Sequence, residues 1–230
     1  MSTEHCLQVI AHIHSDFPAK FGVPRQSGLI EELTAAIFFE PPYRNFEAVR
    51  GLEAFSHIWL IWQFSHNRRE NWSPTVRPPR LGGNTRMGVF ATRSPFRPNL
   101  LGLSCVRLTQ IEEHPQLGPV LHVAGADLVD GTPIYDIKPY LPQFDSHPHA
   151  AGGFTTALPE KLLSVDFPPE LLASIPFDRQ QALLSVLAHD PRPAYQNDPQ
   201  RRYGLSFAGF DIRFTIQGQQ LTVQSVQPLS

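Results

Sequence analysis

Proline is the feature that most limits how this chain can fold, because 23 of its 230 residues are prolines. The proline ring removes a backbone N–H donor and clashes with the preceding helical turn, so long helices cannot run through such a sequence. Hydrophobic residues still make up 41% of the chain, which is enough for an ordinary core. The sequence therefore favours a β-rich fold with many loops over a helical bundle.

Short apolar segments between glycine- and proline-containing loops predict the strands. Residues 58–64 are rich in Trp, Ile and Phe and indicate a buried strand, whereas residues 7–13 alternate as a half-buried strand does. Further strands are expected at residues 35–39, 87–92, 104–111 and 120–126, with a helical turn at 45–52. So many short strands predict a mainly β fold, either a sandwich or a small barrel.

A stretch without periodicity, residues 143–158, is expected to be a linker or long loop. Beyond it, residues 162–167 are expected to form a strand and 178–189 a helix capped by Asp178, with Gln181 completing a capping box. Residues 205–216 and 220–227 are expected to pair as a hairpin about Gly218. The expected organisation is a β domain over residues 1–145 and a small α+β domain over 146–230.

The cysteines and the apolar segments bear on the compartment. Cys6 and Cys105 form neither a disulfide framework nor a zinc-binding pattern. The first residues lack the basic and apolar regions of a signal peptide, and the most apolar run, residues 58–64, is too short to span a bilayer. We therefore expect a cytoplasmic protein.

Positive charge is concentrated in residues 68–97, which hold seven arginines and the single acid Glu70. The net charge of this segment is +6, which leaves −8 for the rest of a chain whose total is −2. Arginine binds phosphate through a planar fork of donors and stacks on bases. A basic patch on an acidic body predicts a polyanion site, although a solvated arginine face paired with acids explains the charge alone equally well.

No glycine-rich nucleotide loop is present, so a doubly wound nucleotide-binding sheet is not expected. Gly82 and Gly83 are better explained as a tight turn. His12 and His14 would point to one side of a strand and could bind zinc or iron together with His114 or His122. Histidines that are exposed or hydrogen-bonded within the protein are the better interpretation, because no metal-binding motif accompanies them.

Two proline-containing segments could bind a polar ligand. Residues 127–133 (DLVDGTP) place two acids before a Gly-Thr-Pro turn, where the side chains can accept backbone hydrogen bonds or hold a ligand. Residues 190–195 (DPRPAY) set an arginine and a tyrosine in a stiff extended frame. Arginine can pair with phosphate and tyrosine can stack on a base, but a rigid surface loop explains this second segment equally well.

Seven segments, in this order along the chain, carry a resemblance to a known family: residues 21–26 (FGVPRQ), 50–57 (RGLEAFSH), 77–84 (RPPRLGGN), 88–99 (GVFATRSPFRPN), 127–133, 136–140 (DIKPY) and 190–195. Together they resemble the TsaA/TrmO family, and the likeness runs from about Leu7 to the C-terminus. One position departs from the family pattern, because Leu100 stands where the family has a proline. We expect this exchange to relax one loop.

The resemblance implies a small β-barrel that binds S-adenosyl-L-methionine without a Rossmann sheet, in a homodimer. It implies methylation of N6 of threonylcarbamoyl-adenosine at position 37, beside the anticodon of threonine tRNAs. The alternative is a barrel that binds RNA without catalysis, and a metal-dependent enzyme using His12 and His14 is the least favoured reading. The cofactor-binding residues that the resemblance implies are Pro24, Arg25, Gln26, His66, Asn67, Arg93, Leu103, Asp127, Leu128, Asp130, Gly131 and Thr132.

The arginine-rich segment would then bind tRNA. The RNA-binding residues implied in this way are Arg77, Arg80, Arg86, Arg97, Lys138, Tyr140, Arg192 and Tyr195. Transfer of a methyl group from a sulfonium mainly requires that donor and acceptor be aligned. A base that removes the N6 proton would help, but the sequence does not assign one.

Overall fold

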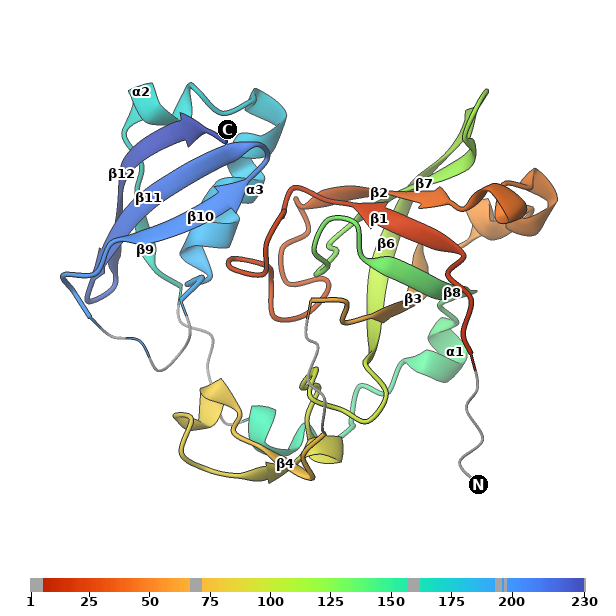
Figure 1. The fold of residues 1–230 in the computed structure, drawn as a ribbon, viewed down its shortest axis with the longest axis horizontal. Coiled ribbons are helices and arrows are strands. Elements are labelled where there is room, and N and C mark those ends of the chain that lie inside the picture. Colours follow the sequence, from red (N-terminus) through yellow and green to blue (C-terminus); the bar gives the residue numbers. More distant parts are fainter. Residues whose placement is uncertain (1–5, 67–71, 157–161, 193–195, 197, 230) are drawn as a thin grey trace.

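A computed structural model describes residues 6–66, 72–156, 162–192, 196 and 198–229. The fold is mainly β, with a closed six-stranded antiparallel barrel followed along the chain by a separate four-stranded sheet (Figure 1). The predicted mainly β barrel fold is confirmed. No helix in the described parts of the chain is long and apolar enough to cross a membrane.

The barrel closes in the order β1-β2-β7-β6-β3-β8. Along β3 the side chains alternate between inside and outside, so that Ile58, Leu60 and Trp62 enter the core. This alternation follows from the two-residue period of a strand. The barrel strands are β1 (Ala11–His14), β2 (Thr34–Phe39), β3 (His57–Gln63), β6 (Leu101–His114), β7 (Gly118–Ala124) and β8 (Pro133–Pro139).

The second sheet has the order β10-β11-β12-β9 and forms, with its helices, what we call the C-terminal unit (residues 162–229). Its strands are β9 (Ser164–Asp166), β10 (Tyr203–Phe207), β11 (Phe210–Gln217) and β12 (Gln220–Pro228). Its helices are α2 (Pro169–Leu172) and α3 (Phe177–Ala188). The buried Leu183 and Leu187 of α3 share one hydrophobic core with the sheet.

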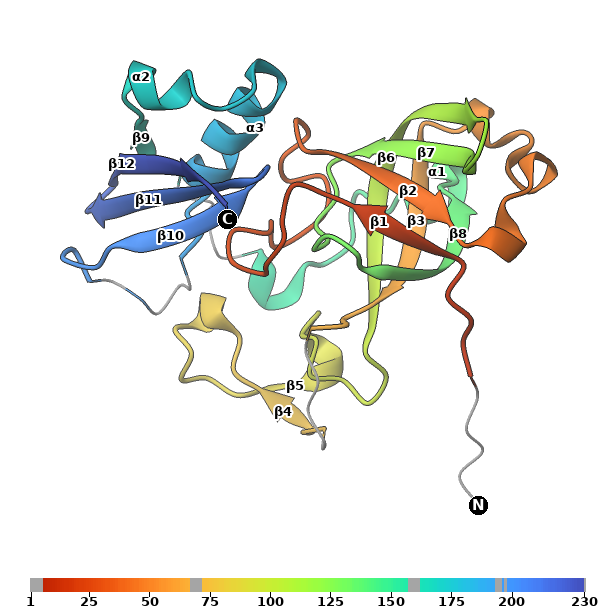
Figure 2. The same cartoon turned by 45° about the horizontal axis from the view of Figure 1, so that its top comes forward.

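The connection between β1 and β2 belongs to the core of the C-terminal unit. Phe17, Ile30 and Leu33 are buried in that core rather than in the barrel. The Phe17 ring packs edge-on against Phe207, with ring centroids 5.3 Å apart. Figure 2 shows this loop between the barrel and the blue sheet. The two cores are therefore tied together by one stretch of chain, residues 16–33.

A long excursion, residues 65–100, leaves the barrel after β3 and returns to it at β6 (Figure 1). A two-stranded ribbon of β4 (Thr75–Val76) and β5 (Met87–Gly88) supports it. The remaining short helices of the chain are α1 (Pro142–Asp145) and the 3-10 helices Pro41–Tyr43, Phe46–Val49, Leu52–Ala54, Pro79–Leu81, Val89–Ala91 and Gly153–Thr155.

Several predicted elements are wrong in their bounds. The strand expected at 87–92 ends at Gly88, because the Val89 amide bonds to Pro74 and the Thr92 hydroxyl bonds back to Val89, closing a 3-10 turn. The strand expected at 205–216 is two strands, since Ala208 and Gly209 adopt positive φ angles in a tight turn. The expected linker at 143–158 includes part of α1 and the 3-10 helix Gly153–Thr155.

Asp178 does not cap its helix. The N-cap residue of α3 is Pro176, which forms no side-chain capping bond, and Asp178 lies in the first turn. The N-cap is therefore two residues before Asp178, and the helix begins at Phe177. An acid in the first turn still interacts favourably with the helix dipole.

Candidate functional site

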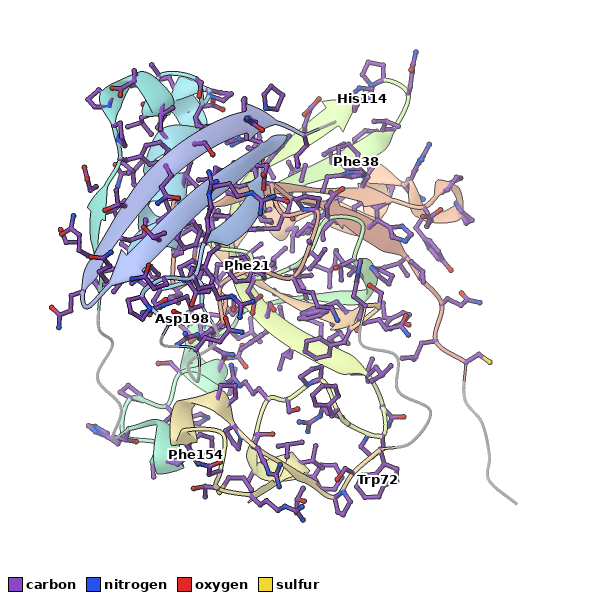
Figure 3. The ribbon with its side chains drawn as sticks, turned by 60° about the vertical axis from the view of Figure 1, so that its left-hand side comes forward. Phe21, Phe38, Trp72, His114, Phe154 and Asp198 are labelled. Carbon is purple, nitrogen blue, oxygen red and sulfur yellow. The ribbon has the colours of Figure 1, made fainter. Side chains whose placement is uncertain are left out.

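A cleft of about 2400 Å³ opens where the barrel, the loop 20–26, the excursion and the C-terminal unit meet. Phe21 and Phe154 lie on opposite sides of it, on the loop before β2 and in the 3-10 helix Gly153–Thr155 (Figure 3). The cleft also borders the ends of β3 and β6 and the turn after β7. Segments distant in sequence, residues 151–155 among them, thus surround one space.

A chain of hydrogen bonds forms the barrel side of this cleft. The Trp62 indole donates to the Ser104 hydroxyl at 2.9 Å, and Ser104 donates to a carboxylate oxygen of Asp127 at 2.6 Å. Ser104 is fully buried, whereas Asp127 lines the cleft. Burial raises the pKa of Asp127 above its ordinary value, although the Ser104 hydrogen bond acts in the opposite direction. Asp127 is therefore a carboxyl group held in a largely dry position.

Local backbone geometry places Asp127 beside the loop 24–28. After β7 the chain turns at Gly125, whose φ is +76°, and the Gly28 amide bonds to the Gly125 carbonyl at 2.8 Å. A Cβ on Gly125 would lie 3.2 Å from the Gly28 backbone, so both the angle and the close approach favour glycine. The Ser27 hydroxyl accepts a bond from the Cys105 amide of β6. The loop is thus fixed to the turn after β7 and to the barrel wall.

Gly102 on β6 allows the Trp62 ring to lie flat against the strand. A Cβ at position 102 would sit 2.3 Å from Trp62 Cε2, and the ring is buried. We predict that Gly102→Ala lowers the free energy of unfolding by about 1–3 kcal/mol, the cost of overpacking a core, and breaks the Trp62–Ser104 hydrogen bond. Urea unfolding measures the first effect.

Gly88→Ala is the matched control for this prediction, because its Cβ would meet nothing within 4 Å and its φ is negative. It should unfold at nearly the same urea concentration as the wild type. Equal stabilities for the two alanine variants would contradict the packing that we describe between Gly102 and Trp62.

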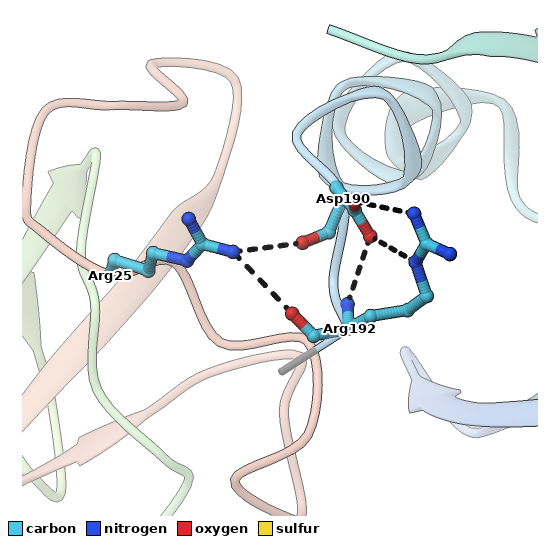
Figure 4. A network of polar contacts seen from close by, with 3 residues as sticks. All are labelled: Arg25, Asp190 and Arg192. Carbon is cyan, nitrogen blue, oxygen red and sulfur yellow. Dashed lines mark hydrogen bonds and ion pairs between the residues drawn. The ribbon is translucent and has the colours of Figure 1, made fainter. Parts of the chain in front are cut away.

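The loop 24–26 contacts both the excursion and the C-terminal unit. Gln26 accepts a hydrogen bond from the Arg93 guanidinium. Arg25 donates to the carbonyl oxygens of Asp190 and Arg192, each at 3.4 Å (Figure 4). The Arg192 guanidinium itself forms two bonds of 2.9 Å to the Asp190 carboxylate. The Arg192–Asp190 bonds thus hold residues 190–192, after α3, so that their carbonyl oxygens face Arg25.

The structure brings most of the predicted cofactor residues to this cleft. Leu128 instead places its side chain in the barrel core, and Asp130 accepts a bond from the Ser15 amide and pairs with His14. Neither they nor Gly131 are among the described residues that line the cleft, and Asn67 lies outside the described residues. The predicted residues that do line it are Pro24, Arg25, Gln26, His66, Arg93, Leu103, Asp127 and Thr132.

The predicted RNA-binding residues fall into two groups. Arg77, Arg86, Arg97 and Arg192 line the cleft. Arg80 lies in the 3-10 helix Pro79–Leu81 of the excursion. Two of the cleft arginines already have hydrogen-bond partners within the protein. Arg97 donates to two carbonyl oxygens of its own loop, and Arg192 donates to the Asp190 carboxylate.

Lys138 and Tyr140 lie away from the cleft, on β8 and just after it. Lys138 pairs with Asp136 at 3.0 Å, and the Tyr140 ring lies 5.8 Å from Trp59. Neither is among the described residues of the cleft. Tyr195 is outside the described part of the chain. The arginines of the excursion and the residues of β8 therefore do not share one surface pocket.

Sequence reasoning did not find Ser104, Trp62 or the exposed Phe90. Ser104 did carry a signal, because it is a polar residue at an inward position of the apolar strand β6. A buried hydroxyl needs a hydrogen-bonding partner, and here it has two. The alternation of inward and outward side chains along β6 places Ser104 inward, which predicts a hydrogen-bonded polar group inside the barrel.

Three of the histidines considered as metal ligands have carboxylate partners, and the fourth, His114, accepts hydrogen bonds from the Gln116 and Leu117 amides. His12 lies 2.8 Å from Glu40, and His122 lies 2.7 Å from Glu112. His14 pairs with Asp130. Within the described ranges, no group of three or more His, Cys, Asp or Glu side chains is arranged to hold a metal ion.

Comparison with known proteins gives consistent matches along the chain. The family model of the tRNA-methyltransferase O N-terminal domain matches residues 12–146, and that of the TrmO C-terminal domain matches residues 160–229. A tRNA (adenine(37)-N6)-methyltransferase of Escherichia coli is 41% identical over 227 residues, which is 95% of this chain and 96% of the relative. A Pseudomonas aeruginosa relative, whose name describes an S-adenosylmethionine-dependent methyltransferase, is 38% identical over 91% of this chain and 92% of its own.

The fold is similar to a crystal structure of TrmO from Pseudomonas aeruginosa. The TM-score is 0.80 at 32% sequence identity, and the match covers 100% of this chain and 99% of that one. Sequence and fold agree over both the barrel and the C-terminal unit. The chain belongs to the TrmO family of tRNA methyltransferases.

Proposed function

We propose that this chain is an S-adenosyl-L-methionine-dependent methyltransferase that acts on N6 of adenine 37 in tRNA. The observation that carries the proposal is the cleft in which the half-buried Asp127 meets the arginine-bearing excursion. The names of the relatives, which cover almost the whole chain, support both the reaction and the methyl donor.

The donors and acceptors of the cleft fit this cofactor. Asp127 can face the sulfonium cation of the cofactor as a carboxylate. A neighbouring positive charge favours the ionised form of this buried acid, whose pKa burial alone raises. Arg93 and Gln26 supply N–H donors and an amide oxygen for the carboxylate and hydroxyl groups of the ligand. The half-exposed Leu103 supplies apolar surface for an aromatic ring. These residues would hold the cofactor.

The bound cofactor supplies an electrophilic methyl group on a sulfonium centre. The protein's own contribution is to hold the RNA base in line with that group, because aligning two reactants can supply several kcal/mol of the barrier, about 7–11 in the best cases. The loop 24–28 is suited to this task, since it is bonded to the turn after β7 and to the C-terminal unit. Burial also places the carboxyl group of Asp127 in a partly desolvated position at the wall of the cleft.

The family resemblance also suggests which modified base is methylated and which tRNA carries it. We propose that the accepted base is threonylcarbamoyl-adenosine in threonine tRNA, and that the protein works in the cytoplasm. We also propose a homodimer, in which the exposed apolar side chains Leu141 and Phe144, at α1, would be covered. Sedimentation of the purified protein tests the dimer.

Transfer of a labelled methyl group tests the proposed function. The full chain is incubated with labelled S-adenosyl-L-methionine and threonine tRNA that carries, or lacks, the threonylcarbamoyl group. Label on N6 of adenine 37 in the modified tRNA is the expected result. Equal transfer to both tRNAs would contradict the proposed requirement for the threonylcarbamoyl group. No transfer to either tRNA would contradict the proposed methyltransferase activity and favour a barrel that binds RNA without catalysis.

Arg77 and Arg192 are predicted to behave differently in RNA binding, although both line the cleft. Arg77 is exposed, so Arg77→Ala should weaken tRNA binding and reduce the slope of log K against log salt by about 0.7–0.9, the value for one phosphate contact. The Arg192 side chain is only 10% exposed and bonded to Asp190. Arg192→Ala should therefore leave the slope nearly unchanged.

Binding is measured by titration at several salt concentrations, and urea unfolding is measured in parallel. We expect Arg192→Ala to lower stability, because it leaves a partly buried Asp190 carboxylate without its partner. A salt slope that falls equally in both variants would make Arg192 a phosphate ligand after all.

A further inference from the structure

We propose that Phe90, Trp72 and Arg97 form a stacking platform for one unpaired base of the RNA substrate. The inference rests on the proposed function and deepens it, because it names how the excursion would hold a nucleotide. Phe90 is 72% exposed and Trp72 is 52% exposed, although both are large aromatic side chains. Trp72 is labelled at the edge of the excursion in Figure 3.

Phe90 lies beside both of the other side chains. The Phe90 and Trp72 rings are stacked, with centroids 6.4 Å apart and planes 29° from parallel. The Arg97 guanidinium carbon lies 5.8 Å from the centroid of the Phe90 ring, within the range of a cation–π contact. An aromatic surface of this kind can accept any base, because every base has a flat π face.

The backbone under the platform is fixed. Val89, directly before Phe90, is buried, and its amide bonds to the Pro74 carbonyl at 2.9 Å. Arg97 donates to the carbonyl oxygens of Val89 and Thr92 at 3.3 and 2.7 Å. The guanidinium that backs the ring is thus held by the same turn that carries the ring. An exposed aromatic on a fixed turn loses little conformational freedom when a partner stacks on it.

The charge around the platform favours a nucleic acid over an apolar peptide. Residues 72–100 contain five arginines and no aspartate or glutamate. Arg77 and Arg86 are exposed and line the same cleft as Phe90 and Arg97. Aromatic side chains beside a basic groove are the combination that binds single-stranded nucleic acids. The occupant that fits is a base from the unpaired loop that contains adenine 37.

Substitutions at Phe90 test the platform in the full chain. The probe is a synthetic anticodon stem-loop RNA of threonine tRNA, and binding is measured by fluorescence anisotropy at several salt concentrations. Phe90→Ala is expected to weaken binding about 5- to 150-fold, the range for one stacked base. Phe90→Tyr should bind as the wild type does, and Phe90→Leu should behave like the alanine variant. The salt slope should not change, because no phosphate contact is lost.

Phe177→Ala is the matched control, since Phe177 is 90% exposed at the start of α3 and is not a cleft residue. A second series replaces single loop nucleotides of the RNA by abasic ones. If Phe90 stacks on one base, removing that base should abolish the difference between wild type and Phe90→Ala, as in a double-mutant cycle.

Three results would overturn the platform. The first is unchanged RNA affinity of Phe90→Ala in a protein that still methylates tRNA, which would leave the proposed function standing. The second is a matching loss of S-adenosyl-L-methionine affinity, which would place the adenine of the cofactor on Phe90. The third is a change of oligomeric mass in Phe90→Ala, which would make this surface a contact between two copies of the chain.

Discussion

Asp127→Asn is expected to weaken S-adenosyl-L-methionine binding by about 2–5 kcal/mol, the cost of removing one member of a buried charge pair. This corresponds to about 30- to 4000-fold in affinity. The demethylated product, S-adenosylhomocysteine, has a neutral sulfur in place of the sulfonium. Its affinity should therefore change far less, and the ratio of the two dissociation constants, measured by calorimetry, is the decisive quantity.

The pH dependence of the wild type follows from the same carboxyl group. Burial raises the pKa of Asp127 above 3.8, so the folded protein binds more protons than the unfolded chain in the window between 3.8 and the raised value. Stability accordingly falls as the pH rises through that window, and Asp127→Asn should reduce this dependence and leave the part that comes from Asp16, whose pKa burial also raises. Cofactor affinity should rise through the same window, because a cation favours the ionised form.

Asp130→Asn is the matched control for Asp127→Asn. Asp130 lies in the same loop as Asp127, but its carboxylate accepts a hydrogen bond from the Ser15 amide. Asp130 is not among the described residues that line the cleft. It should keep the wild-type ratio of cofactor to product affinity. An equal loss of both affinities in Asp127→Asn would mean that Asp127 holds another part of the ligand, such as the ribose, and not the cationic centre.

Phe17→Ala is expected to lower the free energy of unfolding by about 3–5 kcal/mol, the usual cost of emptying a buried phenylalanine site. Phe17 follows β1 of the barrel in sequence, yet its ring packs on Phe207 of the C-terminal unit. The loss should therefore appear in the C-terminal unit as well as in the barrel. Hydrogen exchange of the β10–β11 amides, together with urea unfolding, measures it.

Phe177→Ala provides the comparison, because an exposed phenylalanine should cost no more than about 0.5 kcal/mol. The double variant Phe17→Ala/Phe207→Ala should lose less than the sum of the single losses, since the two rings are in contact. Additive losses, or a change below about 1 kcal/mol for Phe17→Ala alone, would contradict a core shared across the two halves of the chain.

The parts of the fold with strong periodicity could be predicted from sequence. Strand β3 and helix α3 lie within a residue or so of their expected ranges, because a two-residue or 3.6-residue apolar pattern reports which side chains are buried. Strand β8 was not expected, because Pro133 and Pro139 stand at its two ends and the residues before it read as a turn. Prolines at strand ends remove no inner ladder bond, so the strand still forms.

The site was harder to predict than the fold. A pattern of apolar residues cannot say which core a residue joins, so Phe17 could not be assigned to the C-terminal unit from sequence. Arg192 looked available for phosphate, but Asp190, only two residues earlier, takes up its guanidinium. The resemblance named residues near the cleft, yet it could not show that the Asp127 carboxyl accepts a hydrogen bond from a buried serine of β6.

The stretch of residues 16–33 has a consequence for cooperativity. It carries the loop 24–26 beside the cleft and also three side chains of the second core. A ligand that binds at this loop must then lower the population of molecules in which the C-terminal core is open, because it stabilises only the closed state. Thermodynamic reciprocity requires the converse, so a partner that steadies the C-terminal unit tightens ligand binding at the loop. Binding in the cleft and the stability of the C-terminal unit are in this way linked energetically.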